Sequence, residues 1–208
     1  MNTTVLAHPL VQHKLSMLRS KTTSSTLFRA LVEEIGLLLA VAATSHLEVE
    51  GTRLETPLES CEGWRLRGAD PVLVPILRAG LGLVPPFLRL LPAAKVGHIG
   101  LARDHETLLP RAYYRNLPPS MESRSAFILD PMLATGGSAA EAVRQLQESG
   151  STDITLVCVL AAPEGLRHLE EAHPGMRIVT AAVDRELDAR GYILPGLGDA
   201  GDRTFGTA

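Results

Sequence analysis

The sequence predicts an α/β fold in which a parallel central sheet is flanked by helices. From residue 71 onward, short apolar runs that suit strands buried on both faces alternate with amphipathic segments. The expected strands cover residues 71–77, 96–102, 126–130, 154–160 and 177–183, and the expected helices cover residues 81–91, 138–149 and 163–172. This alternation is typical of parallel strands joined by crossover helices.

Residues 1–68 precede this alternation and are predicted to form helices followed by a hairpin. Apolar residues recur every four positions between residues 27 and 39, a spacing that gives a helix one apolar face, so residues 1–46 are predicted to be helical. The apolar stripe widens at residues 37–41, which leaves two interpretations open: contact with a partner subunit, or cover for the protein's own core. Residues 47–68 combine glycine and proline with short alternating runs and are predicted to form a hairpin.

The overall composition favours one cytoplasmic domain that acts on small molecules. A chain of 208 residues without repeats or long linkers is expected to form a single domain over residues 1–208. The net charge of -3 and the lack of a basic run argue against nucleic-acid and membrane partners. Cys61 and Cys158 have no CxxC spacing and predict a reducing compartment, and the longest apolar run, residues 35–43, is about half of a membrane span. The seven histidines form no HExxH or Cys/His cluster, so a metal site built by the protein alone is not expected.

The stretch 127–138 combines a strand end, a tight loop and a helix start. The strand ends in Asp130, and ligands bind beyond the carboxyl ends of strands in open α/β sheets. Pro131 ends the strand pairing, while Gly136 and Gly137 let the backbone approach a ligand closely. Backbone N–H groups that converge at the start of the next helix favour an anion, so the stretch predicts a phosphate cradle. An ordinary glycine-rich turn is the alternative.

Three other glycine-loop chemistries fit the sequence less well. A Walker A loop needs Gly-Lys-Ser/Thr, and residues 127–138 contain no lysine. A serine hydrolase elbow places its serine directly after the strand, whereas Ser138 lies eight residues beyond Asp130. The segment 80–82 begins as a dinucleotide fingerprint, Gly-x-Gly, but Pro85 occupies the position of the third glycine.

Three further segments carry polar chemistry. Arg78 follows the first strand of the alternating region, where a guanidinium can take two phosphate oxygens. Residues 103–119 are rich in arginine and predict a mobile arm that closes over a charged substrate, with a solvated surface hairpin as the alternative. Residues 191–206 are rich in glycine yet keep apolar anchors such as Ile193 and Phe205, so we expect an ordered loop whose backbone contacts a small planar ligand.

Four motifs together resemble the uracil phosphoribosyltransferase family over nearly the whole chain. They are residues 74–82, 130–138, 161–165 and 191–207. The phosphate loop alone indicates the broad phosphoribosyltransferase class, whereas the C-terminal motif is typical of the uracil enzymes. The resemblance implies a type I phosphoribosyltransferase fold with N-terminal helices, a β-arm and a C-terminal hood at residues 185–208 that binds uracil.

The resemblance also implies the residues of the site. Asp130 is expected at the ribose hydroxyls of phosphoribosyl pyrophosphate (PRPP), residues 134–138 at its 5′-phosphate, and Arg78 and Arg103 at its diphosphate. The implied PRPP contacts are Arg78, Arg103, Asp130, Pro131, Met132, Leu133, Ala134, Thr135, Gly136, Gly137, Ser138 and Asp199. The implied uracil contacts are Ile193, Gly198, Asp199 and Ala200. The implied catalytic residues are Asp130, Arg78, Arg103 and Asp199.

The implied reaction is displacement of diphosphate from C1′ of PRPP by N1 of uracil, giving UMP in pyrimidine salvage. Mg²⁺ is expected to arrive mainly with PRPP, because this ion keeps several waters and binds substrate phosphates. The expected partners are uracil and PRPP, a GTP activator as in some members of the family, and further copies of the chain in a dimer or tetramer. One peptide bond near Arg78 is expected to be cis.

Two other functions stay open. A phosphoribosyltransferase for another base uses the same phosphate loop. A PRPP- or nucleotide-sensing regulator on the same fold binds RNA instead, and the acidic net charge counts against it.

Overall fold

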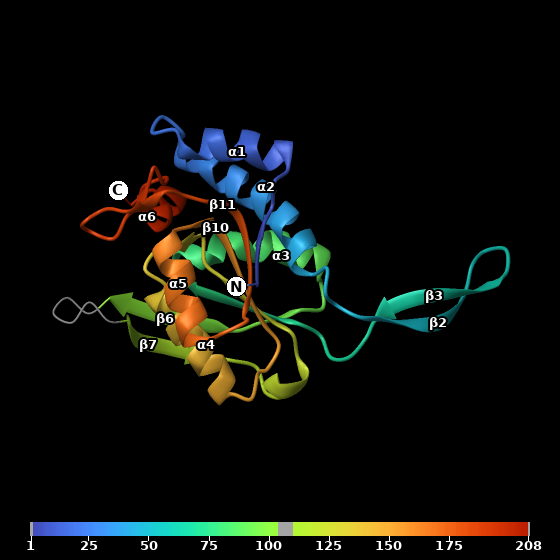
Figure 1. The fold of residues 1–208 in the computed structure, drawn as a ribbon. Coiled ribbons are helices and arrows are strands. Elements are labelled where there is room, and N and C mark those ends of the chain that lie inside the picture. Colours follow the sequence, from blue (N-terminus) through green and yellow to red (C-terminus); the bar gives the residue numbers. More distant parts are fainter. Residues whose placement is uncertain (1, 104–109, 208) are drawn as a thin grey trace.

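The computed structural model describes residues 2–103 and 110–207, without the side chains of Arg103 and Pro110. A central sheet lies between two groups of helices, and a two-stranded hairpin projects from this body (Figure 1). The predicted α/β class, with a mostly parallel central sheet flanked by helices, is confirmed.

The main sheet brings the carboxyl ends of its central strands to one edge. Its strands are β1 (Asn2–Val5), β4 (Val72–Leu77), β5 (Lys95–Val96), β6 (His98–Arg103), β7 (Pro110–Asn116), β8 (Ala126–Leu129), β9 (Met132–Leu133), β10 (Ile154–Ala161) and β11 (Arg177–Val183). They run in the order β1-β11-β10-β8-β4-β6-β7, with β5 beside β4 and β9 beside β10. β7 runs antiparallel to β6, and the other pairings are parallel. The central strands β4, β8 and β10 are apolar and buried, as expected for strands covered on both faces.

The helices cover the two faces of this sheet. They are α1 (Pro9–Arg19), α2 (Ser25–Ala43), α3 (Val84–Leu90), α4 (Gly137–Glu148), α5 (Pro163–Ala172) and α6 (Ala200–Phe205), with 3-10 turns η1 (Ala79–Leu83) and η2 (Met121–Ser123). Helices α1 to α3 pack on one face, and α4 and α5 pack on the other (Figure 1). Ser24 caps α2, because its Oγ accepts the N–H of Leu27 at 3.3 Å.

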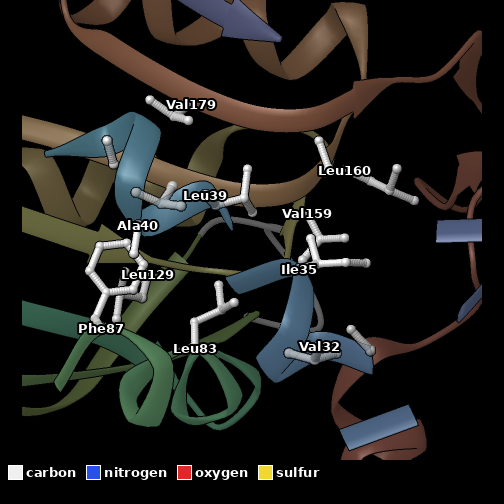
Figure 2. Packing of buried hydrophobic residues seen from close by; sticks show 14 of the residues in the cluster. Val32, Ile35, Leu39, Ala40, Leu83, Phe87, Leu129, Val159, Leu160 and Val179 are labelled. Carbon is white, nitrogen blue, oxygen red and sulfur yellow. The ribbon is translucent and has the colours of Figure 1, made fainter. Parts of the chain in front are cut away.

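Helix α2 forms the centre of the larger core. Figure 2 shows Ile35 and Leu39 of this helix among side chains of β10, such as Val159, and of the η1–α3 segment, such as Leu83 and Phe87. All five side chains are fully buried. Each contributes roughly 1.5 to 3 kcal/mol by leaving water, so this helix fixes the N-terminal segment firmly on the sheet.

Two parts of the N-terminal and central prediction are wrong in detail. Residues 2–5 form the edge strand β1 and are not helical, because this segment pairs in parallel with β11, Thr3 opposite Ile178 and Val5 opposite Thr180. The β-branched side chains of Thr3 and Val5 suit a strand. The helix expected over residues 81–91 is divided, since η1 precedes α3 and the chain turns tightly as it leaves β4.

Two small hairpins complete the fold. The predicted hairpin at residues 47–68 is confirmed as β2 (Val49–Glu55) and β3 (Ser60–Leu66), which pair antiparallel. It extends away from the body (Figure 1) and exposes large apolar side chains, among them Leu58 at 95% and Trp64 at 73%. The C-terminal segment, residues 185–207 and here called the hood, is ordered as expected, but it is more than a loop. It contains β12 (Glu186–Leu187), β13 (Ile193–Leu194) and α6.

Candidate active site

A small cavity of about 80 Å³ opens at the carboxyl end of β8, where the phosphate cradle was predicted. Its lining consists of Asp130, Met132, Leu133, Ala134, Thr135, Gly136, Ser138 and Ala139. Pro131 and Gly137, which the prediction included, do not line it. The carbonyl of Pro131 instead accepts the N–H groups of Val159 (2.9 Å) and Leu160 (3.0 Å), so this proline ties the loop to β10. The cavity has room for one phosphate-sized group.

Gly136 shapes the loop at the start of α4. It is the N-cap of this helix with a φ of +85°, a left-handed conformation that a residue with a side chain adopts at a cost. The first N–H groups of α4 have no partner within the helix, and Ser138 and Ala139 of its first turn line the cavity together with Thr135. The positive end of the helix dipole therefore faces the space where an anion fits.

Gly165, in the first turn of α5, packs against this loop. A Cβ atom at Gly165 would lie 2.4 Å from the carbonyl oxygen of Ala134 and 3.0 Å from that of Leu133. A Cβ atom at Gly136 would in turn lie 2.9 Å from the carbonyl oxygen of Gly165. These approaches explain why residues 161–165 belong with the phosphate loop: their glycine lets α5 touch the cradle backbone.

Asp130 carries the main electrostatic feature of the cavity. Burial raises the pKa of this carboxyl to about 7, and the N–H of Met132, which donates to Oδ1 at 3.3 Å, lowers it in part. Near neutral pH the carboxyl therefore changes protonation state easily. The ionised carboxylate accepts hydrogen bonds from hydroxyl groups of a ligand, and the protonated carboxyl is also able to donate one.

The loop at Arg78 lies against the same strand end. The peptide bond between Leu77 and Arg78 is cis, as expected near this residue. A Cβ atom at Gly80 would lie 2.2 Å from the carbonyl oxygen of Leu129, so glycine is needed for the two loops to meet. The guanidinium of Arg78 is 59% exposed, with Nη2 3.6 Å from Oδ1 of Asp202, and thus remains available to a ligand.

Arg103 is the last residue of β6, two strands from β8 in the sheet. Its backbone pairs with Pro110 at the start of β7, so the polar segment after it begins at the same edge of the sheet. The predicted arm, residues 103–119, contains β7, and residues 104–109 lie outside the described residues, as does the side chain of Arg103. Lid closure and the position of the Arg103 guanidinium therefore stay predictions.

The hood residues lie next to the Arg78 loop. A Cβ atom at Gly201 would lie 3.8 Å from Cβ of Ala79, and α6 packs against η1. Gly198 and Asp199 are exposed, and Asp199 caps α6 by accepting the N–H of Asp202 at 2.8 Å. Ala200 and Ile193 are buried, each 4% exposed.

The expected anchor at Phe205 is wrong. Its ring is 39% exposed and lies 5.8 Å from the guanidinium carbon of Arg78, while Ile193 and Leu197 are each 4% exposed and do anchor the hood. The reason is position: Phe205 ends the short helix α6 at the rim of the site, where its ring faces a cation in preference to the core.

Three arginines hold the hood, and sequence reasoning did not find them. Arg19 at the end of α1 forms a bidentate ion pair with Asp184, next to the hood. Arg29 of α2 donates to the carbonyl of Thr204 at 2.9 Å. Arg203 donates to the carbonyls of Leu197 (2.7 Å) and Ser20 (2.6 Å) and stacks 4.5 Å from the ring centre of Phe28. Single arginines on helices and loops carry no local motif that would have identified these contacts.

Two larger hollows lie away from these residues. One, of about 550 Å³, lies along the exposed β2–β3 hairpin, and another, of about 360 Å³, lies between the carboxyl ends of α4 and α5. Neither contains a predicted site residue. Within residues 2–103 and 110–207, no group of three His, Cys, Asp or Glu side chains is placed to hold a metal ion. No helix in these ranges is both long enough and apolar enough to cross a membrane.

Comparison with known proteins agrees with the geometry. The family model described as uracil phosphoribosyltransferase matches residues 5–207. Uracil phosphoribosyltransferases of Streptococcus mutans and Halalkalibacterium halodurans are each 52% identical to this chain over 203 residues, which cover 98% of this chain and 97% of each relative. A solved protein from Aquifex aeolicus superposes with a TM-score of 0.94 at 37% identity, covering 99% of both chains.

A more distant structure shares the fold at low sequence identity. The adenine phosphoribosyltransferase of Trypanosoma brucei, solved with AMP, pyrophosphate and ribose-5-phosphate, has a TM-score of 0.61 at 13% identity and covers 95% of this chain. At that identity the likeness concerns the fold alone. The match over residues 5–207 and the 52% identity show more, and together they establish that this chain belongs to the uracil phosphoribosyltransferase family.

Proposed function

We propose that the protein transfers the phosphoribosyl group of PRPP to uracil, giving UMP and diphosphate. The observation that carries the proposal is the meeting of three parts at one sheet edge: the phosphate-sized cavity after β8, the Arg78 loop, and the hood. Gly80 packs on Leu129 at the strand end, and Gly201 of the hood lies beside Ala79. These three parts would hold the 5′-phosphate of PRPP, its diphosphate and the incoming base around one ribose. We treat residues 1–208 as one domain that performs this reaction.

The cradle would fix the ribose-5-phosphate part of PRPP. The N–H groups at the start of α4 and the hydroxyls of Thr135 and Ser138 suit the 5′-phosphate. Asp130 would bind the two ribose hydroxyls, and the exposed guanidinium of Arg78 would take diphosphate oxygens. Arg103 is proposed as the second diphosphate ligand because it ends a strand at the same sheet edge.

The hood would read the base through its backbone. N–H groups of Gly198, Asp199 and Ala200 would donate to uracil carbonyl oxygens, and a backbone carbonyl such as that of Ile193 would accept N3–H. Cytosine carries an amino donor where uracil carries O4. It would leave a buried N–H unpaired at a cost of about 1 to 3 kcal/mol, so the arrangement selects uracil.

In the reaction, N1 of uracil forms a bond to C1′ while the bond from C1′ to the diphosphate oxygen breaks. The electron pair of that bond leaves with the diphosphate, where Arg78 and Arg103 stabilise the growing negative charge. The N1 proton passes to solvent at the exposed edge of the hood, where Asp199 is the nearest proposed carboxylate. Exclusion of water from C1′ prevents hydrolysis of PRPP.

Phosphoribosyltransferases generally use Mg²⁺ with PRPP, and the residues here suit a metal that arrives with substrate. Asp199 and Asp130 are separate carboxylates at two sides of the site, and neither belongs to a ready three-ligand cluster among the described residues. Such single carboxylates fit Mg²⁺, which prefers one or two protein oxygens beside substrate phosphates and water. The ion would neutralise charge on the diphosphate, with Asp199 as its protein contact.

We also propose that the protein forms a homo-oligomer in the cytoplasm. The β2–β3 hairpin exposes Leu58 and Trp64 far from the body, more apolar surface than an isolated hairpin needs. We propose that a second copy of the chain covers this apolar surface. Sedimentation of the Leu58→Ser, Trp64→Ser double variant tests this proposal, and we expect the variant to shift to a monomer. Cys61 and Cys158 are free, which suits a reducing compartment.

The decisive experiment is UMP formation from labelled uracil and PRPP with Mg²⁺, run beside cytosine, hypoxanthine and a chelated control. We expect Mg²⁺-dependent UMP with uracil alone. Equal turnover of another base would overturn the base assignment, and absence of both turnover and PRPP binding would overturn the proposal as a whole. Adding GTP to the same assay tests the activator that the family resemblance implies, with a faster rate as the expected result.

A further inference from the structure

An ion pair between the end of α1 and the residue after β11 lies beside the hood. Arg19 donates from Nη1 to Oδ2 of Asp184 at 2.7 Å and from Nη2 to Oδ1 at 2.5 Å. The Asp184 side chain is 5% exposed and that of Arg19 is 24% exposed. Two parallel bonds of this kind fix a guanidinium and a carboxylate in one plane, so the pair is geometrically rigid.

The same two side chains hydrogen-bond to both backbone groups of one hood residue, Gly196. The N–H of Gly196 donates to Oδ2 of Asp184 at 2.8 Å, and the carbonyl of Gly196 accepts from Nη1 of Arg19 at 2.7 Å. Gly196 has a φ of +61°. Its position and orientation are therefore set by a charged pair that belongs to α1 and to the end of β11.

Gly196 in turn packs against the residue proposed to contact the base. A Cβ atom at Gly196 would lie 2.1 Å from the carbonyl oxygen of Ile193 and 3.0 Å from its carbonyl carbon. Only a glycine allows this approach, so a shift of Gly196 toward Ile193 would displace the Ile193 carbonyl. The ion pair is thus connected to the proposed base site through the contact between Gly196 and the Ile193 carbonyl.

The contacts among Arg19, Asp184 and Gly196 are here called the clasp. Asp184 also connects the clasp to the phosphate cradle. Its N–H donates to the carbonyl of Ala161, the last residue of β10, at 2.8 Å. The next residue, Ala162, donates its N–H to the carbonyl of Leu133 in the cradle at 2.8 Å. These backbone hydrogen bonds therefore connect the hood to the same strand ends that hold the phosphate loop.

We propose that Arg19 and Asp184 are positioning residues for the base: they hold Gly196, and through it the Ile193 backbone, at a fixed distance from the phosphate cradle. The inference rests on the proposed function, because it assigns the clasp to uracil binding. Neither side chain touches the substrates. The clasp sets how well the hood is preorganised, and so determines the affinity for uracil with little effect on PRPP.

A purely structural role predicts a different result. If the pair only stabilised the fold, its loss would lower the unfolding midpoint and reduce the amount of active enzyme, but the surviving enzyme would keep its KM for uracil. A positioning role predicts a change in the KM for uracil in enzyme that is folded and binds PRPP normally. The two roles are separated by kinetics per active site.

The test compares Asp184→Asn and Arg19→Lys with a matched control, Glu34→Gln. Asn retains one acceptor for Gly196 and loses the charge, and Lys retains the charge and loses the two-pronged geometry. Glu34 pairs with Lys14 of α1 at 2.6 Å, so the control also breaks an ion pair of this helix, but one remote from the hood. Steady-state kinetics with each substrate varied, and PRPP binding by calorimetry without uracil, are measured for all three.

We expect the KM for uracil to rise about tenfold in both clasp variants, the loss of roughly one hydrogen bond of preorganisation, with PRPP affinity within twofold of wild type. Glu34→Gln is expected to match wild type in both. An unchanged KM for uracil in Arg19→Lys, or an equal rise for uracil and PRPP, overturns the inference. Wild-type activity with uracil in the same experiment tests the proposed function separately, and if Asp184→Asn does not fold, Arg19→Lys decides.

Discussion

The phosphate cradle and the hood meet at one site but are held in different ways. The cradle is a contiguous stretch, Asp130 to Ala139, whose shape follows from the end of β8, the left-handed Gly136 and the start of α4. The hood is held by partners far along the chain: Arg19 bonds to Asp184, 165 residues away, and Arg203 bonds to Ser20, 183 residues away. The shape of the proposed phosphate site is therefore encoded locally, whereas that of the proposed base site depends on how the N-terminal helices and the C-terminal segment pack together.

The largest expected effect comes from the cradle. Asp130→Asn is expected to lower kcat/KM by about 10² to 10³, the range found when one positioned polar group is lost from an active site. The hood should be unaffected, because its contacts do not involve this residue, so the residual activity is expected to keep its preference for uracil over cytosine. Asp70→Asn, an exposed carboxylate before β4, serves as the control and should keep full activity.

The same variant has an opposite effect on stability. The pKa of Asp130 is raised to about 7 in the folded protein from 3.8, so between about pH 4 and pH 7 the folded state binds more protons than the unfolded state. Stability falls as the pH rises through this window, and the full penalty is present above pH 7. Urea unfolding is therefore expected to show Asp130→Asn more stable than wild type at pH 8, on the order of 1 to 3 kcal/mol, and equal to it near pH 3. A variant less stable at pH 8 would contradict the buried-carboxyl account.

The contact between the two phosphate-side loops gives the next effect. Gly80→Ala would place a methyl group 2.2 Å from the carbonyl oxygen of Leu129, so the loops must separate. We expect a loss of about 1 to 3 kcal/mol in unfolding free energy and a raised KM for PRPP. Gly51→Ala, where a Cβ atom meets nothing within 4 Å, is the matched control and should change neither. Equal effects of the two alanines would show that the approach of Gly80 to Leu129 is not needed.

The comparison also explains what the sequence could predict. The α/β class and the phosphate loop follow from local patterns: an apolar strand, a terminal carboxylate, paired glycines and a helix start. Asp130, Gly136 and Ser138, which these patterns predict, line the cavity at the end of β8. The helical prediction for residues 2–5 failed because β1 exists only through pairing with β11, a contact between the two ends of the chain.

The support of the hood could not be predicted for the same reason. Arg19 and Asp184 lie in unremarkable local sequence, and the energy of their pairing depends on a distance that the sequence does not contain. Phe205 shows the reverse error: its apolar character predicted an anchor, but the helix end at which it lies directs the ring toward Arg78. Local patterns identify groups that act near their own backbone, and long-range packing decides the rest.

A smaller effect is expected from Arg203 in the hood. Arg203→Lys retains one charge but cannot bond to Leu197 and Ser20 together, nor stack as well on Phe28. We expect about 1 kcal/mol less stability and a rise of a fewfold in the KM for uracil, with the KM for PRPP unchanged. Arg190→Lys, an 81% exposed arginine of the same segment, is the control. A change in the KM for PRPP alone would mean that the hood and the cradle are not held independently.

The smallest effect lies at the other end of the sheet, where His46 approaches Asp153 at 3.5 Å and Phe127 at a ring-centre distance of 6.0 Å. Burial, and then the nearby charge of Arg177, lower the pKa of His46 below 6.5. The folded state therefore binds fewer protons than the unfolded state just below pH 6.5, and stability falls as the pH drops through that region. His46→Gln is expected to remove this loss, a few tenths of a kcal/mol between pH 7 and pH 5, without altering any kinetic constant. Both groups titrate between about pH 4 and pH 7, where the larger Asp130 effect makes their combined contribution fall as the pH rises. His46→Gln should therefore steepen this fall slightly, whereas Asp130→Asn should leave only the small rise that His46 causes, and a pH series of urea midpoints for both variants would detect any exchange of these assignments.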